Sequence, residues 1–169
     1  MEKEKNIIFE GEYLNGKRHG KGEEFNEYNE LLFEGEYLYN YRRKGKKYLD
    51  GKLIYEGEYL YDSKWSGKGY DIEGNKIYEL INGNGPVKEY REDFGFPSFE
   101  GEYLNGKRNG KGKEYGPSGK VEYEGEYLNG KRNGKGKEYN DDGELKFAGE
   151  YLNGERWNGK GKEYNYDGN

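Results

Sequence analysis

Cysteine is absent from the 169 residues, so neither disulfide bonds nor thiolate metal sites are available, and a reducing intracellular compartment is favoured. One histidine and no threonine leave almost no choice of base for a nucleophilic triad. Residues 1–6 lack the apolar stretch of a signal peptide, and no hydrophobic run approaches membrane-spanning length. These absences predict a non-enzymatic, cytoplasmic protein, either free or peripheral to a membrane or the cytoskeleton.

Apolar residues are also scarce: 30% of the chain is hydrophobic and 37% is charged, which is too little apolar material for a thick two-layer core. The composition nevertheless argues against disorder, because 20 tyrosines, 7 phenylalanines and 2 tryptophans are far more aromatic residues than disordered chains carry. A net charge of -5 argues against a nucleic-acid-binding protein. The composition therefore predicts a thin fold in which aromatic rings pack over glycine backbone.

A repeated unit organises the chain. Residues 99–115 read Phe-Glu-Gly-Glu-Tyr-Leu-Asn-Gly-Lys-Arg-Asn-Gly-Lys-Gly-Lys-Glu-Tyr, and copies follow at 24-residue intervals. A fixed period of this size indicates a tandem array in which each unit packs against its neighbours. Aromatic and charged residues alternate on both sides of an Asn-Gly turn signal, so each unit is predicted to be a β-hairpin. The units open at Phe9, Phe33, Tyr55, Phe99, Tyr123 and Phe147.

The pattern degrades once, in a segment that contains Pro86 and Pro97 and has lost the Gly-Glu-Tyr core of the unit. Proline and glycine clusters mark bends or boundaries. We therefore predict four segments: a charged lead (1–8), repeats one to three (9–77), a degenerate repeat or bend (78–98), and repeats five to seven (99–169).

Charge pairing suggests a register for the regular sixth unit. Placing Glu126 opposite Lys135 and Glu124 opposite Lys137 closes the hairpin around residues 129–132 and puts opposite charges on one face. Tyr139 then falls on the charged face unless a bulge turns it inward. The other face is predicted to carry Tyr123, Gly125, Tyr127, Gly134 and Gly136.

Irregular positions are the candidate contact residues, because the repeat itself does not require them. The second unit has a dense basic run in its turn, either an ordinary solvated turn or a contact for an acidic protein or a phosphorylated lipid head group. The third and last units have one extra turn residue that brings in a tryptophan, which either folds over its own strand or anchors a partner. The predicted partner-binding residues are Tyr39, Tyr41, Arg42, Arg43, Lys44, Lys46, Lys47, Trp65 and Trp157.

Catalytic chemistry finds no support in the sequence. The paired carboxylates recur in every unit opposite lysines, so their environments are alike. General acid and base catalysis instead needs two carboxylates whose environments differ. Residues 154–160 match the glycine and lysine spacing of a phosphate-binding loop, but Gly161 stands where a serine or threonine should bind magnesium. We predict no catalytic residue, cofactor site, metal site or small-molecule substrate.

The segments Phe-Glu-Gly-Glu-Tyr-Leu-Asn-Gly-Lys-Arg-Asn-Gly-Lys-Gly at 99–112 and the near-identical 123–136 resemble the MORN repeat (membrane occupation and recognition nexus), in a variant class with 24-residue spacing. This resemblance implies an all-β fold, an elongated, single-layer, twisted antiparallel sheet of about seven tandem hairpins. It also implies roles as a scaffold, adaptor or oligomerising module, and some family members have been proposed to bind phosphoinositide membranes.

The function predicted from these features is a non-catalytic scaffold that binds other proteins through aromatic and basic turn residues held at fixed spacing. One alternative is a structural subunit of a cytoskeletal, ciliary or viral-particle-like assembly, a homo-oligomer joined through exposed edge strands. The other is a peripheral binder of anionic phospholipid head groups.

Overall fold

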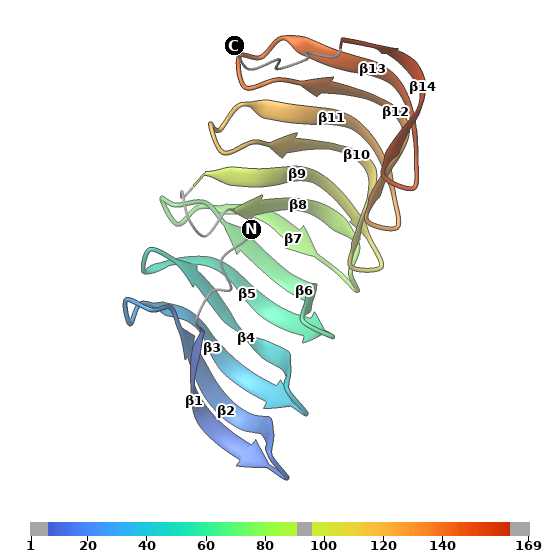
Figure 1. The fold of residues 1–169 in the computed structure, drawn as a ribbon. Coiled ribbons are helices and arrows are strands. Elements are labelled where there is room, and N and C mark those ends of the chain that lie inside the picture. The colour runs from blue at the N-terminus through green and yellow to red at the C-terminus, as the bar shows by residue number, and fades with distance from the viewer. Residues whose placement is uncertain (1–6, 91–95, 163–169) are drawn as a thin grey trace. The chain divides into compact units, whose positions relative to one another are not determined.

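A computed structural model describes residues 7–90 and 96–162, and within these ranges all regular structure is β-strand (Figure 1). The chain forms two compact units, Met1–Pro86 and Val87–Asn169, each built on one open antiparallel sheet of seven strands. The first sheet contains β1 (Ile8–Leu14), β2 (Lys17–Phe25), β3 (Leu31–Leu38), β4 (Tyr41–Leu49), β5 (Lys52–Leu60), β6 (Ser63–Tyr70) and β7 (Lys76–Leu80). The second contains β8 (Gly85–Tyr90), β9 (Pro97–Leu104), β10 (Lys107–Tyr115), β11 (Val121–Leu128), β12 (Lys131–Tyr139), β13 (Leu145–Leu152) and β14 (Glu155–Gly161).

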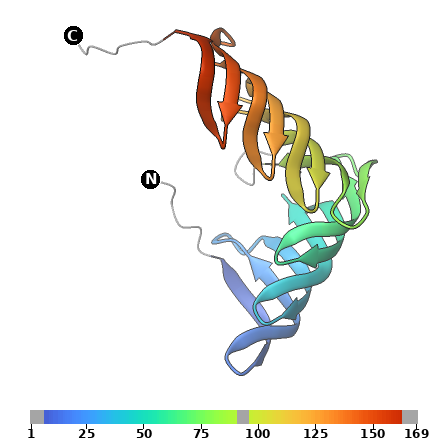
Figure 2. The same cartoon turned by 90° about the vertical axis from the view of Figure 1, so that its right-hand side faces the viewer.

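The predicted all-β array of tandem hairpins is confirmed, but its strands are divided between two sheets rather than joined in one. In both sheets every strand pairs with its neighbours in the chain, so the hairpins stack in sequence order (Figure 2). The division falls between β7 and β8, in the segment where the repeat pattern degrades. The exact limits of the four predicted segments stay a prediction.

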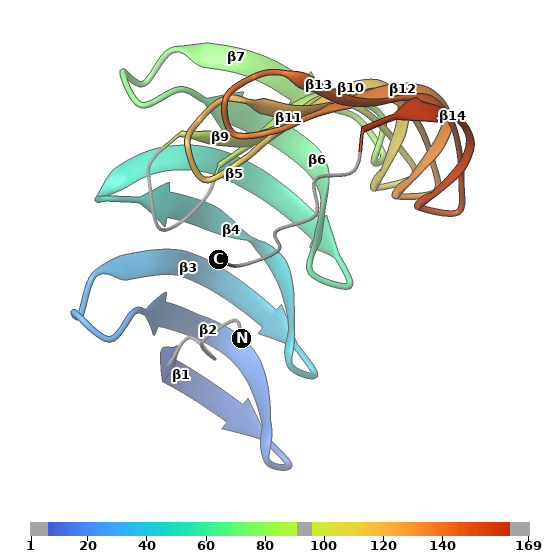
Figure 3. The same cartoon turned by 45° about the horizontal axis from the view of Figure 1, so that its top comes forward.

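Two-residue turns close the hairpins. Asn15 and Gly16 both have positive φ, 52° and 74°, the requirement of the type I′ turn that matches strand twist. The same two slots hold Tyr39 and Asn40 between β3 and β4, and Tyr61 and Asp62 between β5 and β6. In the first sheet the β1–β2, β3–β4 and β5–β6 turns follow one another along one side (Figure 3).

The core of each unit is a single layer of aromatic rings over glycines, as predicted. Tyr123 is fully buried, and its hydroxyl lies 2.4 Å from where a Cβ on either Gly125 or Gly136 would stand. These two glycines pair directly across β11 and β12. The same arrangement recurs with the first aromatic of every unit, at Phe9, Phe33, Tyr55, Phe99 and Phe147.

Edge-to-face ring contacts join one unit to the next. In the second sheet the ring of Tyr127 lies 5.2 Å from that of Phe99 and 5.5 Å from that of Tyr123, and Tyr151 continues the series at 5.0 Å from Tyr123. Aromatic pairs in this geometry add about 0.5–1.5 kcal/mol each beyond the area they bury. Neighbouring hairpins are thus held together by a continuous aromatic ladder.

The register predicted for the sixth unit is correct only far from the turn. Glu124 pairs with Lys137 as predicted, but the carboxylate of Glu126 accepts a hydrogen bond from the backbone N–H of Lys135 (2.7 Å), and a bulge there shifts the register. Gly134 was wrongly predicted for the aromatic face, because a Cβ there would meet Glu126 instead. Tyr139 does lie on the charged face, where its hydroxyl donates to Glu124 at 2.7 Å.

The two tryptophan-containing hairpins are one residue shorter than the regular ones, not longer as predicted. Gly149 pairs with Gly159, so Leu152 lies seven residues before that glycine, whereas Leu128 lies eight residues before Gly136 in the sixth unit. In this register Gly159 lies beneath the ring of Phe147, where a Cβ would stand 2.7 Å from the ring. In the shortened hairpins of β4, β6 and β14 the bulge residues are Arg43, Trp65 and Trp157.

Candidate interaction surfaces

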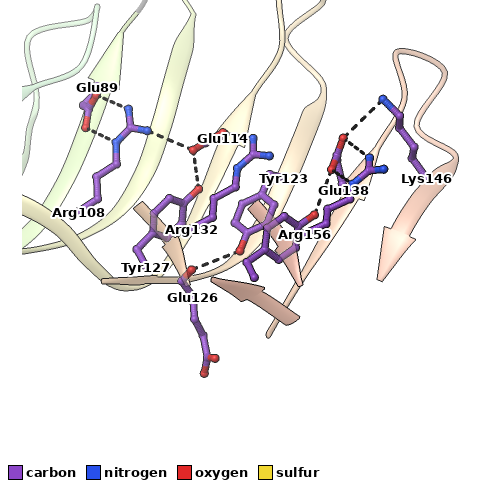
Figure 4. A network of polar contacts seen from close by, with 11 residues as sticks. Glu89, Arg108, Glu114, Tyr123, Glu126, Tyr127, Arg132, Glu138, Lys146 and Arg156 are labelled. Carbon is purple, nitrogen blue, oxygen red and sulfur yellow. Dashed lines mark hydrogen bonds and ion pairs between the residues drawn. The ribbon is translucent and has the colours of Figure 1, made fainter. Parts of the chain in front are cut away.

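The aromatic face of the second sheet is covered by arginines that pair with glutamates (Figure 4). The guanidinium of Arg132 lies 4.2 Å from the ring centroid of Tyr123, and Arg108 lies 4.1 Å from that of Phe99. Glu114 accepts hydrogen bonds from both arginines and from the Tyr127 hydroxyl at 2.9 Å. The polar groups named here are satisfied within the sheet, so this network is structural.

Glu138 forms the next node of the same network. It accepts from Arg156 (2.7 Å to Nη2) and from the Tyr151 hydroxyl (3.1 Å), and Lys146 lies 3.6 Å away. Burial opposes ionisation of Glu138, but the hydrogen bonds from Arg156 and Tyr151 outweigh it and hold the pKa of Glu138 below its ordinary value. Burial, together with the negative charge of Glu138, raises the pKa of Tyr151 to about 12. Near neutral pH both groups keep their ordinary charge states, and neither is poised to transfer a proton.

The predicted basic run of β4 is divided between the two faces of the first sheet. Arg42 lies on the aromatic face, 4.7 Å from the ring centroid of Phe33, where it pairs with the buried carboxylate of Glu24. Lys47 stands in register between Phe33 and Tyr55, at the position that Glu24 and its counterparts take in other units.

The other three cations of the run lie on the charged face. The Arg43 side chain is 67% exposed, with Nη1 4.0 Å from Glu36. Lys46 is 3.6 Å from Glu34, and Lys44 is exposed in register with glutamates on both neighbouring strands. The run is therefore interleaved with carboxylates and does not form a purely positive surface.

The predicted aromatic contacts differ in exposure. Tyr39 is 51% exposed and packs against the ring of His19 (5.3 Å), while Tyr41 is 47% exposed and packs edge-to-face on Tyr61 (5.5 Å). Trp65 is half-buried, whereas Trp157 at the bulge of β14 is 69% exposed.

A groove of about 620 Å³ lies beside the turns of β3–β4 and β5–β6 in the first unit. We call it the tip groove. It brings together five of the nine predicted contact residues and three apolar residues that sequence reasoning missed. One signal was available for Tyr61, which occupies a turn slot that holds asparagine in the regular units. The predicted five are Tyr41, Arg42, Arg43, Lys44 and Trp65, and the missed three are Leu38, Leu60 and Tyr61.

A second, larger trough of about 980 Å³ crosses β9 to β13 on the charged face of the second sheet. Its floor is the bare backbone of paired glycines, and glutamates and lysines line both sides. Tyr115 and Tyr139 border this face, where their hydroxyls donate to Glu100 (2.9 Å) and Glu124 (2.7 Å). Four of the predicted contact residues, Tyr39, Lys46, Lys47 and Trp157, lie outside the tip groove, and partner binding by all nine stays a prediction.

Comparison with known proteins identifies the repeats. The MORN repeat family matches residues 9–25, 99–121 and 123–144, each of which holds one hairpin of the fold. No curated protein matches the chain. The part of the chain that the structure describes contains no helix long and apolar enough to cross a membrane. MORN repeats occur in proteins that interact with other proteins and with membranes, and the family is generally non-enzymatic. With three matching hairpins in an all-β tandem array, the chain is a MORN-repeat protein.

Proposed function

We propose that this MORN-repeat protein is a non-catalytic scaffold for protein–protein interaction, and that a partner protein binds in the tip groove. The observation that carries the proposal is the aromatic and apolar wall of this groove, where Tyr41, Tyr61 and Leu60 are 47%, 74% and 42% exposed. Exposed aromatics around a concavity, flanked by arginine, are typical of the residues that dominate binding energy in protein interfaces.

Backbone geometry at the turns supports this reading. Tyr39 and Tyr61 have φ of 50° and 48°, in the left-handed region, where the equivalent residue of the regular units is asparagine. A residue with a bulky side chain costs on the order of 1 kcal/mol more there than glycine. The turn does not need tyrosine at either position, so a role in binding accounts for a side chain that the fold disfavours.

The charges beside the groove indicate what the partner carries. Arg43 and Lys44 flank the apolar wall, and Glu36 and Glu58 stand opposite Lys44. A partner segment with an apolar anchor and an adjacent acidic side chain complements this arrangement. An anionic membrane is a poorer match, because it is attracted by clusters of unpaired lysine and arginine.

Site-specific photocrosslinking tests the proposal. A benzoylphenylalanine at position 61 should form a covalent adduct with a protein from the source cells. The same probe at the exposed Leu128, on β11 of the second sheet, should not. The double change Arg43→Glu with Lys44→Glu should abolish the adduct without altering the far-ultraviolet circular dichroism spectrum. No adduct at position 61 would count against the tip groove.

Two further measurements separate the alternatives. Co-sedimentation with phosphatidylserine vesicles that falls steeply with salt would favour the lipid-binding function over the scaffold. A dimer or polymer that survives high salt in light scattering would favour the structural-subunit function, because backbone pairing at sheet edges is insensitive to screening.

A further inference from the structure

A row of alternating charges crosses the charged face of the second sheet beside the glycine floor of the trough. The row follows the strand register from Glu100 through Lys113 and Glu124 to Lys137. Glu124 lies 3.9 Å from Lys113 and 3.8 Å from Lys137, so it pairs with a lysine on each side. We call this row the charge ladder.

The charge ladder is interrupted at Ala148. This residue stands in register between Lys137 of β12 and Lys160 of β14, in the place where a carboxylate should alternate with them. Lys137 pairs only on its other side, with Glu124, and Lys160 has no ion pair with any residue in the described ranges. The five other regular units carry a glutamate at this position: Glu10, Glu34, Glu56, Glu100 and Glu124.

The gap is therefore the size of one carboxylate and is flanked by two ammonium groups. The Lys137 side chain is 56% exposed and Lys160 is also exposed, so an incoming group can reach both. Ala148 and Lys137 themselves line the trough, where the adjacent glycine backbone leaves room for a polypeptide main chain.

The rest of the trough limits the identity of the ligand. Its lining contains four glutamates (Glu100, Glu124, Glu126, Glu150) and four lysines (Lys111, Lys113, Lys135, Lys137), so its formal charge is zero. A membrane surface or a nucleic acid needs an extended positive patch. A single acidic side chain needs only the local excess of positive charge that Lys137 and Lys160 provide at the gap.

We propose that the gap at Ala148 binds the carboxylate of one aspartate or glutamate of a partner polypeptide whose main chain lies along the trough. This site goes beyond the tip groove, because it lies in the other unit and uses different residues. Loss of binding at either site leaves the other to be tested by itself.

The experiment uses a displayed library of random linear peptides, selected on the full chain and then compared on variants. Ala148→Glu fills the gap with the residue that five other units already carry, so the fold is expected to tolerate it. Ala148→Gln is the matched control, with the same size and no charge. Selected peptides should share one fixed acidic position, and Ala148→Glu should weaken their binding at least about tenfold more than Ala148→Gln, because it adds repulsion to the loss of the gap.

Binding at the gap can be observed directly, because Ala148 is the only alanine in the sequence. With ¹³C-methyl alanine, one resonance should shift when a selected peptide is added, and should not shift when the acidic residue of that peptide is replaced by its amide. An empty selection, peptides without a fixed acidic position, an unmoved methyl resonance or equal losses in the two variants would each overturn the proposal. Binding to phosphatidylserine vesicles that Ala148→Glu abolishes would replace the polypeptide by a membrane.

Discussion

Replacing one buried glycine tests whether the aromatic-over-glycine layer holds the fold together. Gly125→Ala adds a Cβ whose nearest neighbours are the Tyr123 hydroxyl at 2.4 Å, the Gly136 Cα at 2.6 Å and the Lys135 carbonyl oxygen at 2.7 Å. Two of these three atoms are backbone, so the clash cannot be relieved by rotating a side chain. The strands must separate or the ring must leave its buried position.

The expected magnitude follows from two opposing effects. Overpacking of a close-packed interior costs about 1–3 kcal/mol. Glycine-to-alanine replacement also reduces the conformational entropy of the unfolded chain, which raises the free energy of unfolding by about 0.4–1 kcal/mol. With backbone atoms in the way we expect a net loss of about 2 kcal/mol, which lowers the melting temperature of a unit of this size by roughly 10 °C.

Thermal unfolding followed by circular dichroism, with the tyrosine signal as a second probe, measures this loss. Gly116→Ala is the matched control, because its Cβ would meet no atom closer than 3.6 Å. In a Tyr123→Phe background, which removes the closest clashing atom, Gly125→Ala should cost less, giving a coupling energy of about 0.5–1 kcal/mol. An unchanged melting temperature, or an equal loss in the control, would refute the proposed packing.

Three further predictions follow from the polar groups and the turns. Glu114→Gln should destabilise the unit that contains the second sheet by about 1–3 kcal/mol in urea unfolding, because the partly buried Arg132 loses the carboxylate that it pairs with, while Arg108 keeps Glu89; no change would show that the network is dispensable. Glu138 has a folded-state pKa below its ordinary value of 4.5, so its contribution to stability is present above pH 4.5 and lost as the pH falls through the lowered value. Glu138→Gln should therefore reduce stability at pH 7 and make stability fall less steeply as the pH is lowered below 4.5. Tyr61→Asn should raise the melting temperature of the unit that contains the first sheet, since asparagine tolerates the left-handed region better, while it weakens binding of the partner captured by the probe at position 61, measured with the otherwise unmodified chain; a lower melting temperature would show that the tyrosine is there for the turn.

Local sequence signals were sufficient for the hairpins and the core. The 24-residue period and the Asn-Gly pairs locate the strands and turns, because both residues of a type I′ turn need positive φ and few residue types supply it. The alternation of Tyr123, Gly125 and Tyr127 likewise predicts which side chains share the buried face, since the strand period is two. These features depend only on residues close together in the chain.

The candidate sites were harder to predict because bulges decide which face a residue takes. Around Arg132 three residues of β12 stand opposite one residue of β11, which moves this arginine out of the predicted turn and into register with Tyr127 on the aromatic face. Its pairing with Glu114 then joins two units, at a separation of 18 residues. No local pattern encodes such a shift.

The strand register of the tryptophan hairpins was also not predictable from the sequence. Residues 158–161 have the same sequence as residues 133–136, Asn-Gly-Lys-Gly. Aligning the two segments therefore implies one extra residue in the turn of the last hairpin. In the structure Gly159 rather than Gly161 lies opposite Gly149, where a Cβ would stand 2.7 Å from the Phe147 ring and 2.5 Å from the carbonyl oxygen of Ala148. The consequence is that Gly161, with no side chain, pairs with Phe147 where Glu138 pairs with Tyr123. Shortening the last hairpin by one residue thus exposes Trp157 at the bulge and removes a network glutamate at the same time, so this irregular hairpin exchanges internal pairing for exposed surface.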